Sequence, residues 1–142
     1  MSPAEERAQR SAAAMWQDDA ASQGLGMEIL EIGPGTAKLA MTIRPDMVNG
    51  HGTAHGGYIY TLADSAFAFA CNSYNERAVA AHGSISYIKP GKMGKRLIAT
   101  AREVSRSGRS GIYDVEISQD DDVIAHFRGH SRLIGGSVFE QK

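Results

Sequence analysis

One carboxylate stands out in the middle of the chain because its neighbours are apolar or small. Asp64 is the only charged residue in the stretch 58–75. A carboxylate among apolar groups loses hydration, which raises its pKa and suits it to act as a general base or as a nucleophile. A structural role is the alternative, in which the carboxylate accepts hydrogen bonds from Thr61 or Ser65 or pairs with an arginine. Both roles fit the residues around Asp64.

Two glycines before this segment suggest a second chemical group. Gly56 and Gly57 lie where a helix is predicted to begin, and the first N–H groups of a helix have no partner within it. These N–H groups and the positive end of the helix dipole can bind an anion or a polarised carbonyl. Glycine also lets a substrate approach the backbone closely. An oxyanion donor and a carboxylate are two of the components that acyl transfer requires.

The separation of these two groups limits how they can act together. Gly56 and Asp64 are eight residues apart in the sequence, which is about 12 Å along an α-helix. A donor and a base must both come within about 3 Å of one reacting group. We therefore expect Asp64 of one subunit to face the Gly56 amide of another, so that a dimer completes the site.

The elements that position these groups follow from hydrophobic periodicity. Segment 56–73 has apolar residues at helical spacing and predicts a helix of about five turns. Ser2 to Glu5 form a capping box with proline at the first helical position, which predicts an N-terminal helix to about Gly24. Six stretches of strand-like composition predict strands at 27–32, 36–43, 78–88, 96–104, 111–118 and 122–134. This order favours an α+β fold, an antiparallel sheet with helices on one face.

The central helix is predicted to be covered on both sides. On a helical wheel Asp64 shares a face with Gly57, Thr61 and Ala68, and this face has few polar groups. One sheet covers only one side of such a helix. The other side is expected to contact a second copy of the chain or a ligand.

The composition fits a soluble globular protein of a single domain. The chain has 142 residues, and its 15 basic side chains nearly balance its 16 acidic ones, so no overall field favours nucleic acid. The single cysteine, Cys71, excludes an internal disulfide and suits a reducing compartment. We find neither the apolar core of a signal peptide nor a segment long and apolar enough to span a membrane. We therefore expect a cytoplasmic protein without nucleic-acid or membrane partners.

Four motifs after the N-terminal helix occur in the order seen in one protein family. They are NGHGTAHGGYIYTLADSAFAFACN, which contains HGG-x₆-D, then ISYIKPGKMG, RSGRSGIYDVEI and FRGHSRLIGG. Together they resemble the hotdog-fold acyl-CoA thioesterases of the phenylacetate-degradation (PaaI) type. The resemblance implies one hotdog domain over residues 1–142, with an N-terminal helix in 1–25 and a core in 26–136. It also implies a long central helix wrapped by five or six antiparallel strands, a homodimer with composite active sites, and a homotetramer.

The same resemblance implies residue roles and a substrate class. Asp64 would be the general base or nucleophile, and the Gly56 N–H would bind the thioester carbonyl. His55 would help to hold that turn or the carbonyl, and Asn49 would orient the attacking water or the substrate. The expected reaction is hydrolysis of an aryl-acyl-CoA, phenylacetyl-CoA or hydroxyphenylacetyl-CoA, to the free acid and CoA. No metal and no dissociable cofactor is expected, since coenzyme A is part of the substrate.

Some relatives have a serine or threonine at the start of the strand after the helix, as a further group that binds water. The nearest positions here are Ala80, Ala81 and His82. The sequence leaves open whether His82 or Ser84 replaces that group.

The ends of the substrate suggest further candidates. The acyl group is expected between subunits along the helix, beside Tyr60, Phe67 or Ala68. The phosphates of CoA call for cations or backbone donors. The basic candidates in turns and at strand ends are Lys89, Lys92, Lys95, Arg106, Arg109 and Arg128. Among these, Arg106 and Arg109 in the turn RSGRSG, and Lys89, are our candidates for binding CoA.

Other functions were weighed on the same residues. His51 with His55, and His126 with His130, have metal-like spacing, but the first pair lies in a glycine-rich turn and the second lacks a third ligand. The HGG motif also occurs in lipases, but no G-x-S-x-G elbow is present. The remaining alternatives are a thioesterase for medium-chain or other acyl-CoA or for an acyl carrier protein, a non-catalytic acyl-CoA-binding protein, and a hydratase or dehydratase.

Overall fold

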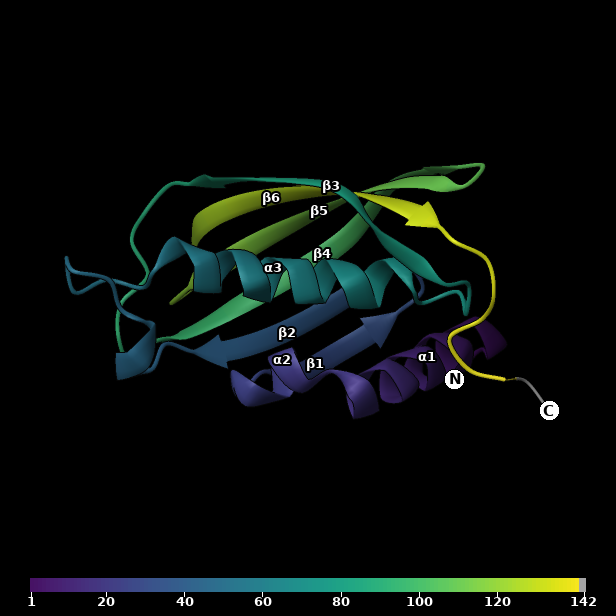
Figure 1. Cartoon of the computed structure of the whole chain (residues 1–142), viewed down its shortest axis with the longest axis horizontal. Coiled ribbons are helices and arrows are strands. Elements are labelled where there is room, and N and C mark those ends of the chain that lie inside the picture. The colour runs from purple at the N-terminus through teal and green to yellow at the C-terminus, as the bar shows by residue number, and fades with distance from the viewer. Residues whose placement is uncertain (141–142) are drawn as a thin grey trace.

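The computed structural model describes residues 1–140 and confirms an α+β fold with a long helix against an antiparallel sheet (Figure 1). Within these residues the helices are α1 (Pro3–Asp18), α2 (Ala20–Gly24), a 3-10 turn η1 (Pro45–Met47) and α3 (Gly56–Cys71). The strands are β1 (Glu28–Gly33), β2 (Thr36–Thr42), β3 (Ala78–Tyr87), β4 (Arg96–Ser107), β5 (Ser110–Gln119) and β6 (Asp122–Leu133). The predicted strands are confirmed with small shifts at their ends, of which the longest is the extension of β4 to Ser107.

The six strands form one sheet in the order β1-β2-β4-β5-β6-β3, and every neighbouring pair is antiparallel. Figure 1 shows α3 crossing one face of this sheet and α1 lying alongside β1, at that edge. The opposite edge is formed by β3, whose outward-facing residues are exposed. The sheet therefore has one edge flanked by a helix and one open edge.

Two tight turns each connect a neighbouring pair of strands and set the register of that pair. Pro34 and Gly35 connect β1 and β2, and Gly35 has a φ of 69°, which a proline–glycine turn requires. Asp120 and Asp121 connect β5 and β6 with φ values of 51° and 65°. Two successive residues with left-handed backbone conformation form a type I′ hairpin turn, whose twist matches that of the strands. Aspartate adopts the left-handed conformation more readily than most residues.

The N-terminal helical segment contains a break that the sequence did not reveal. One helix was predicted to Gly24, whereas α1 ends at Asp18 and α2 begins at Ala20. The Asp19 side chain accepts hydrogen bonds from the Ser22 N–H at 3.0 Å and from the Ser22 hydroxyl at 2.7 Å. An aspartate that caps a new helix start competes with continuation of the old helix.

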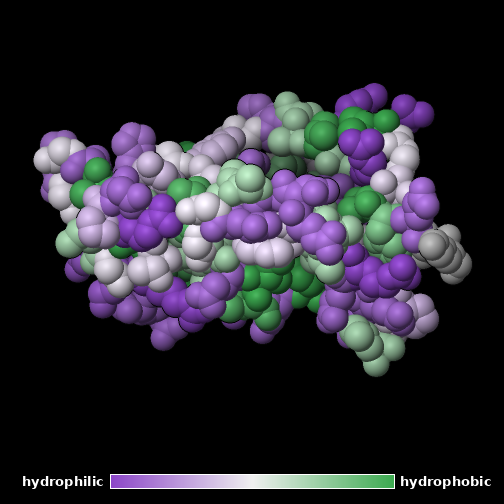
Figure 2. Space-filling model, turned by 60° about the horizontal axis from the view of Figure 1, so that its bottom comes forward, coloured by the Kyte–Doolittle hydropathy of each residue, from purple (hydrophilic) through white to green (hydrophobic). Residues whose placement is uncertain are grey.

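The side of the molecule formed by α1, α2 and β1 also carries an apolar groove. Figure 2 shows a hydrophobic area over β1 beside hydrophilic residues of the N-terminal helices. The groove has a volume of about 510 Å³, and its apolar lining comes from Ala12, Ala13, Ile29, Leu30 and Ile32. None of the residues predicted to do chemistry contributes to the lining of this groove.

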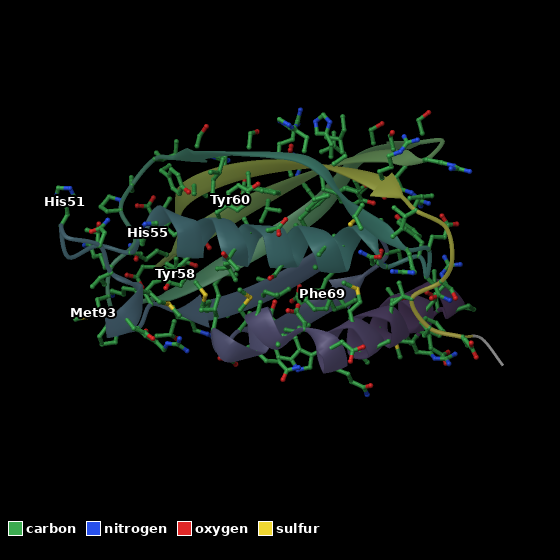
Figure 3. The ribbon with its side chains drawn as sticks, in the orientation of Figure 1. His51, His55, Tyr58, Tyr60, Phe69 and Met93 are labelled. Atoms are coloured by element: carbon green, nitrogen blue, oxygen red, sulfur yellow. The ribbon has the colours of Figure 1, made fainter. Side chains whose placement is uncertain are left out.

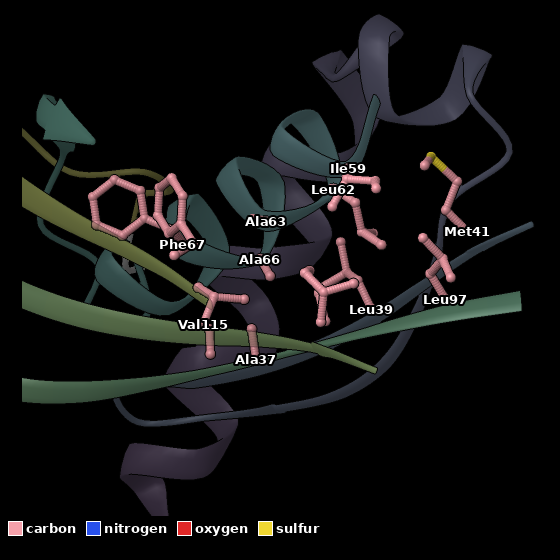
Figure 4. Packing of buried hydrophobic residues seen from close by; sticks show 14 of the residues in the cluster. Ala37, Leu39, Met41, Ile59, Leu62, Ala63, Ala66, Phe67, Leu97 and Val115 are labelled. Carbon is pink, nitrogen blue, oxygen red and sulfur yellow. The ribbon is translucent and has the colours of Figure 1, made fainter. Parts of the chain in front are cut away.

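The core lies between α3 and the middle strands. Figure 4 shows Leu62 and Ala66 of α3 facing Leu39 of β2 and Leu97 of β4, all of them buried. Phe67 packs against the rings of Tyr113 and Phe127, with centroids 5.7 Å and 5.8 Å away. One side of α3 is thus fixed against the sheet, as its periodicity predicted.

The end of α3 is tied to the start of β3 by one side chain. The Asn72 amide donates to the carbonyls of Ala68 at 2.9 Å and Ala78 at 3.1 Å, and its oxygen accepts from the Ala78 N–H at 2.9 Å. The Ala68 carbonyl also accepts from the Asn72 backbone N–H at 3.1 Å, so these side-chain bonds add to the capping of the helix end. They explain why the helix ends at Cys71 rather than at residue 73.

The close contact of α3 with β6 gives a prediction for stability. A Cβ added at Gly129 would lie 2.8 Å from the buried Phe67 ring. We expect Gly129→Ala to lower the free energy of unfolding by about 1–3 kcal/mol, as overpacking does, measured by urea denaturation. Gly24→Ala is the control, because its Cβ would meet nothing within 4 Å. Equal stability of the two variants would contradict this account of the core.

None of the helices in residues 1–140 has both the length and the apolar character needed to cross a membrane.

Candidate active site

The loop before α3 is built around the side chain of Asn49. Its Oδ1 accepts hydrogen bonds from the N–H groups of His51 at 2.9 Å and Thr53 at 3.2 Å. The Asn49 N–H donates to the Thr53 carbonyl at 2.8 Å, which closes the loop. Within residues 1–140 the Asn49 amide NH₂ has no acceptor. The oxygen of this side chain therefore shapes the loop, and its nitrogen is left as a donor.

His55 is the N-cap of α3. Its Nδ1 accepts a hydrogen bond from the Gly57 N–H at 2.9 Å, and its own N–H donates to the Met47 carbonyl at 2.8 Å. An Nδ1 that accepts cannot carry a proton, so the neutral ring holds its proton on Nε2. Figure 3 shows His55 and His51 at the end of the molecule where α3 begins. His55 thus holds the turn at which the helix starts.

The Gly56 N–H is left free by this capping arrangement. His55 binds the Gly57 N–H, and the Tyr58 N–H donates to the His55 carbonyl at 3.0 Å. Among residues 1–140 no group accepts from the Gly56 N–H. One backbone donor at the positive end of the helix is therefore available for a ligand.

Tyr87 is a neighbour of this donor that sequence reasoning missed. Its hydroxyl donates to the Gly56 carbonyl at 2.8 Å. A Cβ on Gly56 would lie 2.9 Å from Cζ of that ring, so the close approach requires glycine at this position. Tyr87 is the last residue of β3, and only the packing of β3 beside α3 brings it to Gly56. No local signal in the sequence points to this contact.

A shallow cavity opens beside the helix start. It has a volume of about 350 Å³, and Gly56, Ile59, Tyr87, Lys89 and Gly91 contribute to its lining. The lining is mainly apolar, with the backbone of Gly56 and the Tyr87 hydroxyl as polar groups. Such a cavity can accept part of an elongated ligand whose reacting group lies at Gly56.

Asp64 is half-buried on α3, and its carboxylate has no partner among residues 1–140. Burial raises the pKa of its carboxyl above the ordinary value. The Thr61 hydroxyl donates to the Gly57 carbonyl at 2.8 Å, and the Ser65 hydroxyl is bonded to that of Ser22 at 2.8 Å. Among residues 1–140 no side chain forms a hydrogen bond or an ion pair with Asp64. The two hydroxyls that a structural role would use are therefore engaged elsewhere.

The face of α3 that carries Asp64 is the part of the helix that its own chain leaves partly open. Gly57 is exposed and Thr61, Asp64 and Ala68 are half-buried, whereas the sheet-facing residues are buried. Cys71, on the same face of the wheel, is buried, and burial raises the pKa of its thiol to about 12. The thiol therefore stays protonated, which leaves Asp64 as the candidate reactive group on this face of α3.

The candidates for binding CoA lie at both ends of the protomer. Lys89 lies beside the cavity at the helix start and pairs with Asp122 at 2.6 Å. Arg106 lies near the other end of α3, where its guanidinium stacks over Tyr74 at 3.7 Å and approaches Glu103 at 3.8 Å. Arg109 lies in the nearby turn between β4 and β5. Within one chain only Lys89 is brought to the Gly56 donor.

The two candidates on β3 face away from the helix. A Cβ on Gly83 would point at the Tyr60 hydroxyl of α3, so Gly83 is on the inner face of the sheet. Side chains alternate along a strand, which puts His82 and Ser84 on the outer face. Neither side chain can bind a water at α3 of its own chain.

Phe67 is also placed differently from our expectation for the acyl site. It is buried within the core between Tyr113 and Phe127. Tyr60 and Ala68 are half-buried on the sides of α3 that its own sheet does not cover completely. These two, and not Phe67, remain available to line an acyl site.

The two histidine pairs with metal-like spacing do not form a group of metal ligands in the part of the chain that the structure describes. In residues 1–140 no group of three or more His, Cys, Asp or Glu side chains is placed to hold a metal ion. His55 uses Nδ1 to cap α3, and His126 and His130 are exposed residues of β6.

One protomer therefore carries the two candidate groups that an acyl-transfer site would need. A free N–H lies at the start of α3, and an unpartnered carboxylate lies eight residues further along the helix. Hydrogen-bond donors directed at a developing oxyanion and a positioned base are the components of carbonyl hydrolysis. Their separation on one helix is that expected of groups that belong to different sites.

Comparisons with known proteins agree with this chemistry. Residues 51–126 match the family model described as the thioesterase superfamily. The chain is 41% identical to the acyl-coenzyme A thioesterase PaaI of Escherichia coli K12, over 93% of this chain and 95% of that protein.

Solved structures show the same likeness. The structure of E. coli PaaI, from the phenylacetic acid degradation operon, has a TM-score of 0.92 and 40% identity, and covers 94% of this chain and 97% of its own. The structure of smu.793 from Streptococcus mutans UA159, bound to acetyl CoA, has a TM-score of 0.75 and 26% identity, and covers 78% of this chain and 90% of its own. The chain belongs to the thioesterase superfamily and is a thioester hydrolase of the hotdog fold.

Proposed function

We propose that this protein hydrolyses acyl-CoA thioesters and that its preferred substrates are aryl-acetyl-CoA compounds, phenylacetyl-CoA or a hydroxylated form of it. Two observations on α3 together carry the proposal. Asp64 is half-buried and unpartnered on the face of α3 that its own chain leaves partly open, and the first N–H of the same helix, at Gly56, is free. The likeness to E. coli PaaI over almost the whole chain supports CoA as the thiol part of the substrate.

A homodimer is part of the proposal because one chain separates the two groups. The open edge strand β3 offers unpaired backbone groups to a second copy. Pairing of β3 with its own copy extends the sheet and brings the open stripes of the two α3 helices together. Asp64 of one chain then faces the Gly56 N–H of the other. In the proposed assembly, two such dimers associate into a tetramer.

The proposed chemistry begins with the thioester carbonyl bound by the Gly56 N–H. In one route, Asp64 of the other chain removes a proton from water, and the water oxygen attacks the carbonyl carbon. In the second route the carboxylate attacks directly, and water then hydrolyses the mixed anhydride. In both, the carbon–sulfur bond breaks, CoA leaves as a thiolate that takes up a proton, and the free acid remains. These steps use only protein groups and water.

The neighbouring residues support these steps. His55 keeps the Gly56 N–H free by capping the next N–H group, and the Asn49 NH₂ is the donor available to hold the water or the substrate. Tyr60 and Ala68 would flank the acyl group in the cleft between subunits. Lys89 would bind a CoA phosphate at the helix start. Arg106 and Arg109, at the far end of one chain, would contribute only where the second chain brings them near.

A cytoplasmic location is part of the same proposal. Its support is the unpaired Cys71, which is the only cysteine of the chain.

Release of free thiol tests the function and the substrate class together. We expect turnover with phenylacetyl-CoA and hydroxyphenylacetyl-CoA, and lower kcat/KM with benzoyl-CoA and with medium-chain acyl-CoA. The rate is followed with a thiol-reactive dye, and calorimetry measures binding of the same compounds. Tight binding without thiol release would instead indicate an acyl-CoA-binding protein. Equal kcat/KM for aryl and alkyl compounds would remove the aryl preference from the proposal.

The pH dependence of turnover tests the role of Asp64. The base must be ionised to act, and burial raises its pKa. The kcat/KM should therefore fall as the pH decreases through a value above that of an ordinary aspartate. A pH–rate profile on phenylacetyl-CoA measures this acid limb. An acid limb at the pKa of a free carboxylate would show that the active base is fully hydrated.

A further inference from the structure

Among residues 1–140, the two peptide units around the Gly56 N–H are held at every polar group except that one. The His55 carbonyl, which shares a peptide unit with this N–H, accepts from the Tyr58 N–H at 3.0 Å. In the next unit, the Gly57 N–H donates to Nδ1 of His55 at 2.9 Å, and the Gly56 carbonyl accepts from the Tyr87 hydroxyl at 2.8 Å. Three contacts thus fix two consecutive peptide planes, and the free N–H keeps a defined direction.

A helix start with two successive glycines needs outside contacts to fix its geometry. Glycine has no Cβ, so its backbone angles are less restricted than those of other residues. Rotation about the bonds of the Gly56 Cα changes the angle between the two peptide planes and with it the direction of the N–H. A donor stabilises a developing oxyanion only when it is already directed at the position of that oxygen. The contacts around Gly56 therefore supply an alignment that the glycines alone do not.

Tyr87 is the one of these contacts that comes from a distant part of the chain. It is 31 residues from Gly56 and is the last residue of β3, whereas His55 and Tyr58 belong to the helix start itself. A carbonyl oxygen has two lone pairs, so the hydroxyl can bind Gly56 without displacing a bond within the helix. Partial burial raises the pKa of the Tyr87 hydroxyl above its ordinary value, so it stays protonated and can donate.

The strand that carries Tyr87 is also the edge through which the proposed dimer forms. β3 is open on its outer side, and pairing with its own copy would bring the second chain beside α3. Asp64 of that chain must then meet a carbonyl bound at Gly56. Because Tyr87 joins the start of α3 to the end of β3, it fixes the donor relative to the strand on which the other chain is aligned.

We propose that Tyr87 is a positioning residue, whose hydroxyl holds the Gly56 carbonyl so that the Gly56 N–H points at the thioester carbonyl oxygen. Tyr87 acts through Gly56 rather than on the substrate. The inference rests on the proposed hydrolysis and goes beyond it by naming the group that orients the oxyanion donor. The carbonyl oxygen is more negative in the transition state than in the bound substrate. Loss of the alignment therefore lowers kcat and leaves KM nearly unchanged.

Steady-state kinetics of Tyr87→Phe test this role, because the substitution keeps the ring and removes only the hydroxyl. We expect kcat on phenylacetyl-CoA to fall about tenfold, which is less than the loss of a whole oxyanion donor. The KM and the midpoint of thermal denaturation should change little. Tyr87→Ala, which also removes the ring, should lose a similar factor in kcat. Tyr58→Phe is the matched control and should keep the wild-type kcat, since the Tyr58 hydroxyl forms no hydrogen bond within residues 1–140.

Infrared spectra of a bound thioester measure the alignment of the donor directly. In the slow Asp64→Asn variant, phenylacetyl-CoA with an isotope-labelled carbonyl can be observed while it is bound. A donor directed at the carbonyl oxygen weakens the C=O bond and lowers its stretching frequency. We expect the band in Asp64→Asn to lie below that of the free substrate, and the added Tyr87→Phe substitution to move it back toward the free value. A contribution of Tyr87 to the fold alone would leave the band unchanged.

The outcomes separate this inference from the proposed function. An active wild type with an unchanged kcat and an unchanged carbonyl band in Tyr87→Phe would overturn the role of Tyr87 alone. A loss of kcat in Tyr87→Ala but not in Tyr87→Phe would assign the effect to ring packing and would also overturn it. Binding of phenylacetyl-CoA without turnover would overturn the hydrolysis, and a carbonyl band that depends on Tyr87 would still support the alignment. A protein that neither binds nor hydrolyses acyl-CoA would overturn both.

Discussion

Replacing Asp64 with asparagine is expected to lower kcat/KM for an aryl-acyl-CoA by about 10²–10⁴-fold, the usual contribution of a general base. Asparagine has nearly the same size but can neither remove a proton nor attack the carbonyl. The measurement is thiol release under subsaturating substrate. A loss of less than tenfold would mean that another group supplies the base.

The same substitution should make the protein more stable at neutral pH. Burial raises the folded-state pKa of Asp64 above its unfolded value, so the folded protein binds more protons in the interval between the two values. Stability then falls as the pH rises through that interval, because the buried carboxylate must ionise. Asparagine removes this cost. Thermal denaturation at neutral pH should therefore show a higher midpoint for Asp64→Asn than for the wild type.

The two effects together distinguish a catalytic from a structural carboxylate. If the Asp64 carboxylate stabilised the fold, replacing it would lower both the activity and the stability of the protein. We expect the Asp64→Asn variant to lose activity only. Asp18→Asn is the matched control, since Asp18 is an exposed aspartate at the end of α1. It should change neither the rate nor the midpoint. A lower midpoint for Asp64→Asn would assign Asp64 to structural support of the fold or of the dimer.

Gly56→Ala is expected to lower kcat by about 10²-fold, which is the loss seen when one oxyanion donor is displaced. The substitution keeps the N–H but adds a Cβ that would lie 2.9 Å from Cζ and 3.0 Å from the hydroxyl of Tyr87. Either the ring or the start of α3 must then shift, and both line the cavity. Steady-state kinetics with phenylacetyl-CoA measure the loss.

Two further variants show whether the contact with Tyr87 is the cause. The double variant Gly56→Ala with Tyr87→Ala removes the clash and should recover part of the lost rate. Gly50→Ala is the control, because its Cβ would meet nothing within 4 Å. If the double variant is slower than Gly56→Ala alone, the clash is not the source of the defect.

Mixing the two inactive variants tests whether the site is shared between chains. In a heterodimer of Asp64→Asn with Gly56→Ala, one site combines both defects and the other has an intact Asp64 and an intact Gly56. After random exchange of subunits in equal amounts, about a quarter of the wild-type activity should return, as expected for an isologous dimer. No recovery after verified exchange would place both groups of a site in one chain.

Local patterns in the sequence were sufficient to predict most of the helices and strands of this fold and to suggest the candidate reactive groups. The helical period around Asp64 predicted a helix with an open stripe, and α3 has that stripe. Proline and glycine at positions 34 and 35 marked the first hairpin. These features depend on neighbours within a few residues, where backbone preference and side-chain period act directly. The roles of Asn49, His55, Gly56 and Asp64 in catalysis remain predictions for the kinetic experiments.

The break at Asp19 shows where local reasoning failed. The alanine-rich segment favours helix on both sides of this residue, and the capping bonds from Asp19 to Ser22 compete with that preference. Packing also contributes, because the Ser22 hydroxyl is bonded to Ser65 of α3. A helix boundary that depends on a contact 43 residues away has no sufficient local signal.

Contacts between distant segments were decided only by the tertiary structure. Tyr87 meets Gly56 because β3 lies beside the start of α3, and Arg106 stacks on Tyr74 because β4 ends near the end of that helix. His82 meets His130 only through the register of β3 with β6. Sequence spacing carries no information on such pairs, since packing of the core and the order of strands set which distant residues become neighbours. The candidate reactive residues could therefore be proposed from the sequence, whereas their spatial neighbours and the faces they occupy were decided by the tertiary structure.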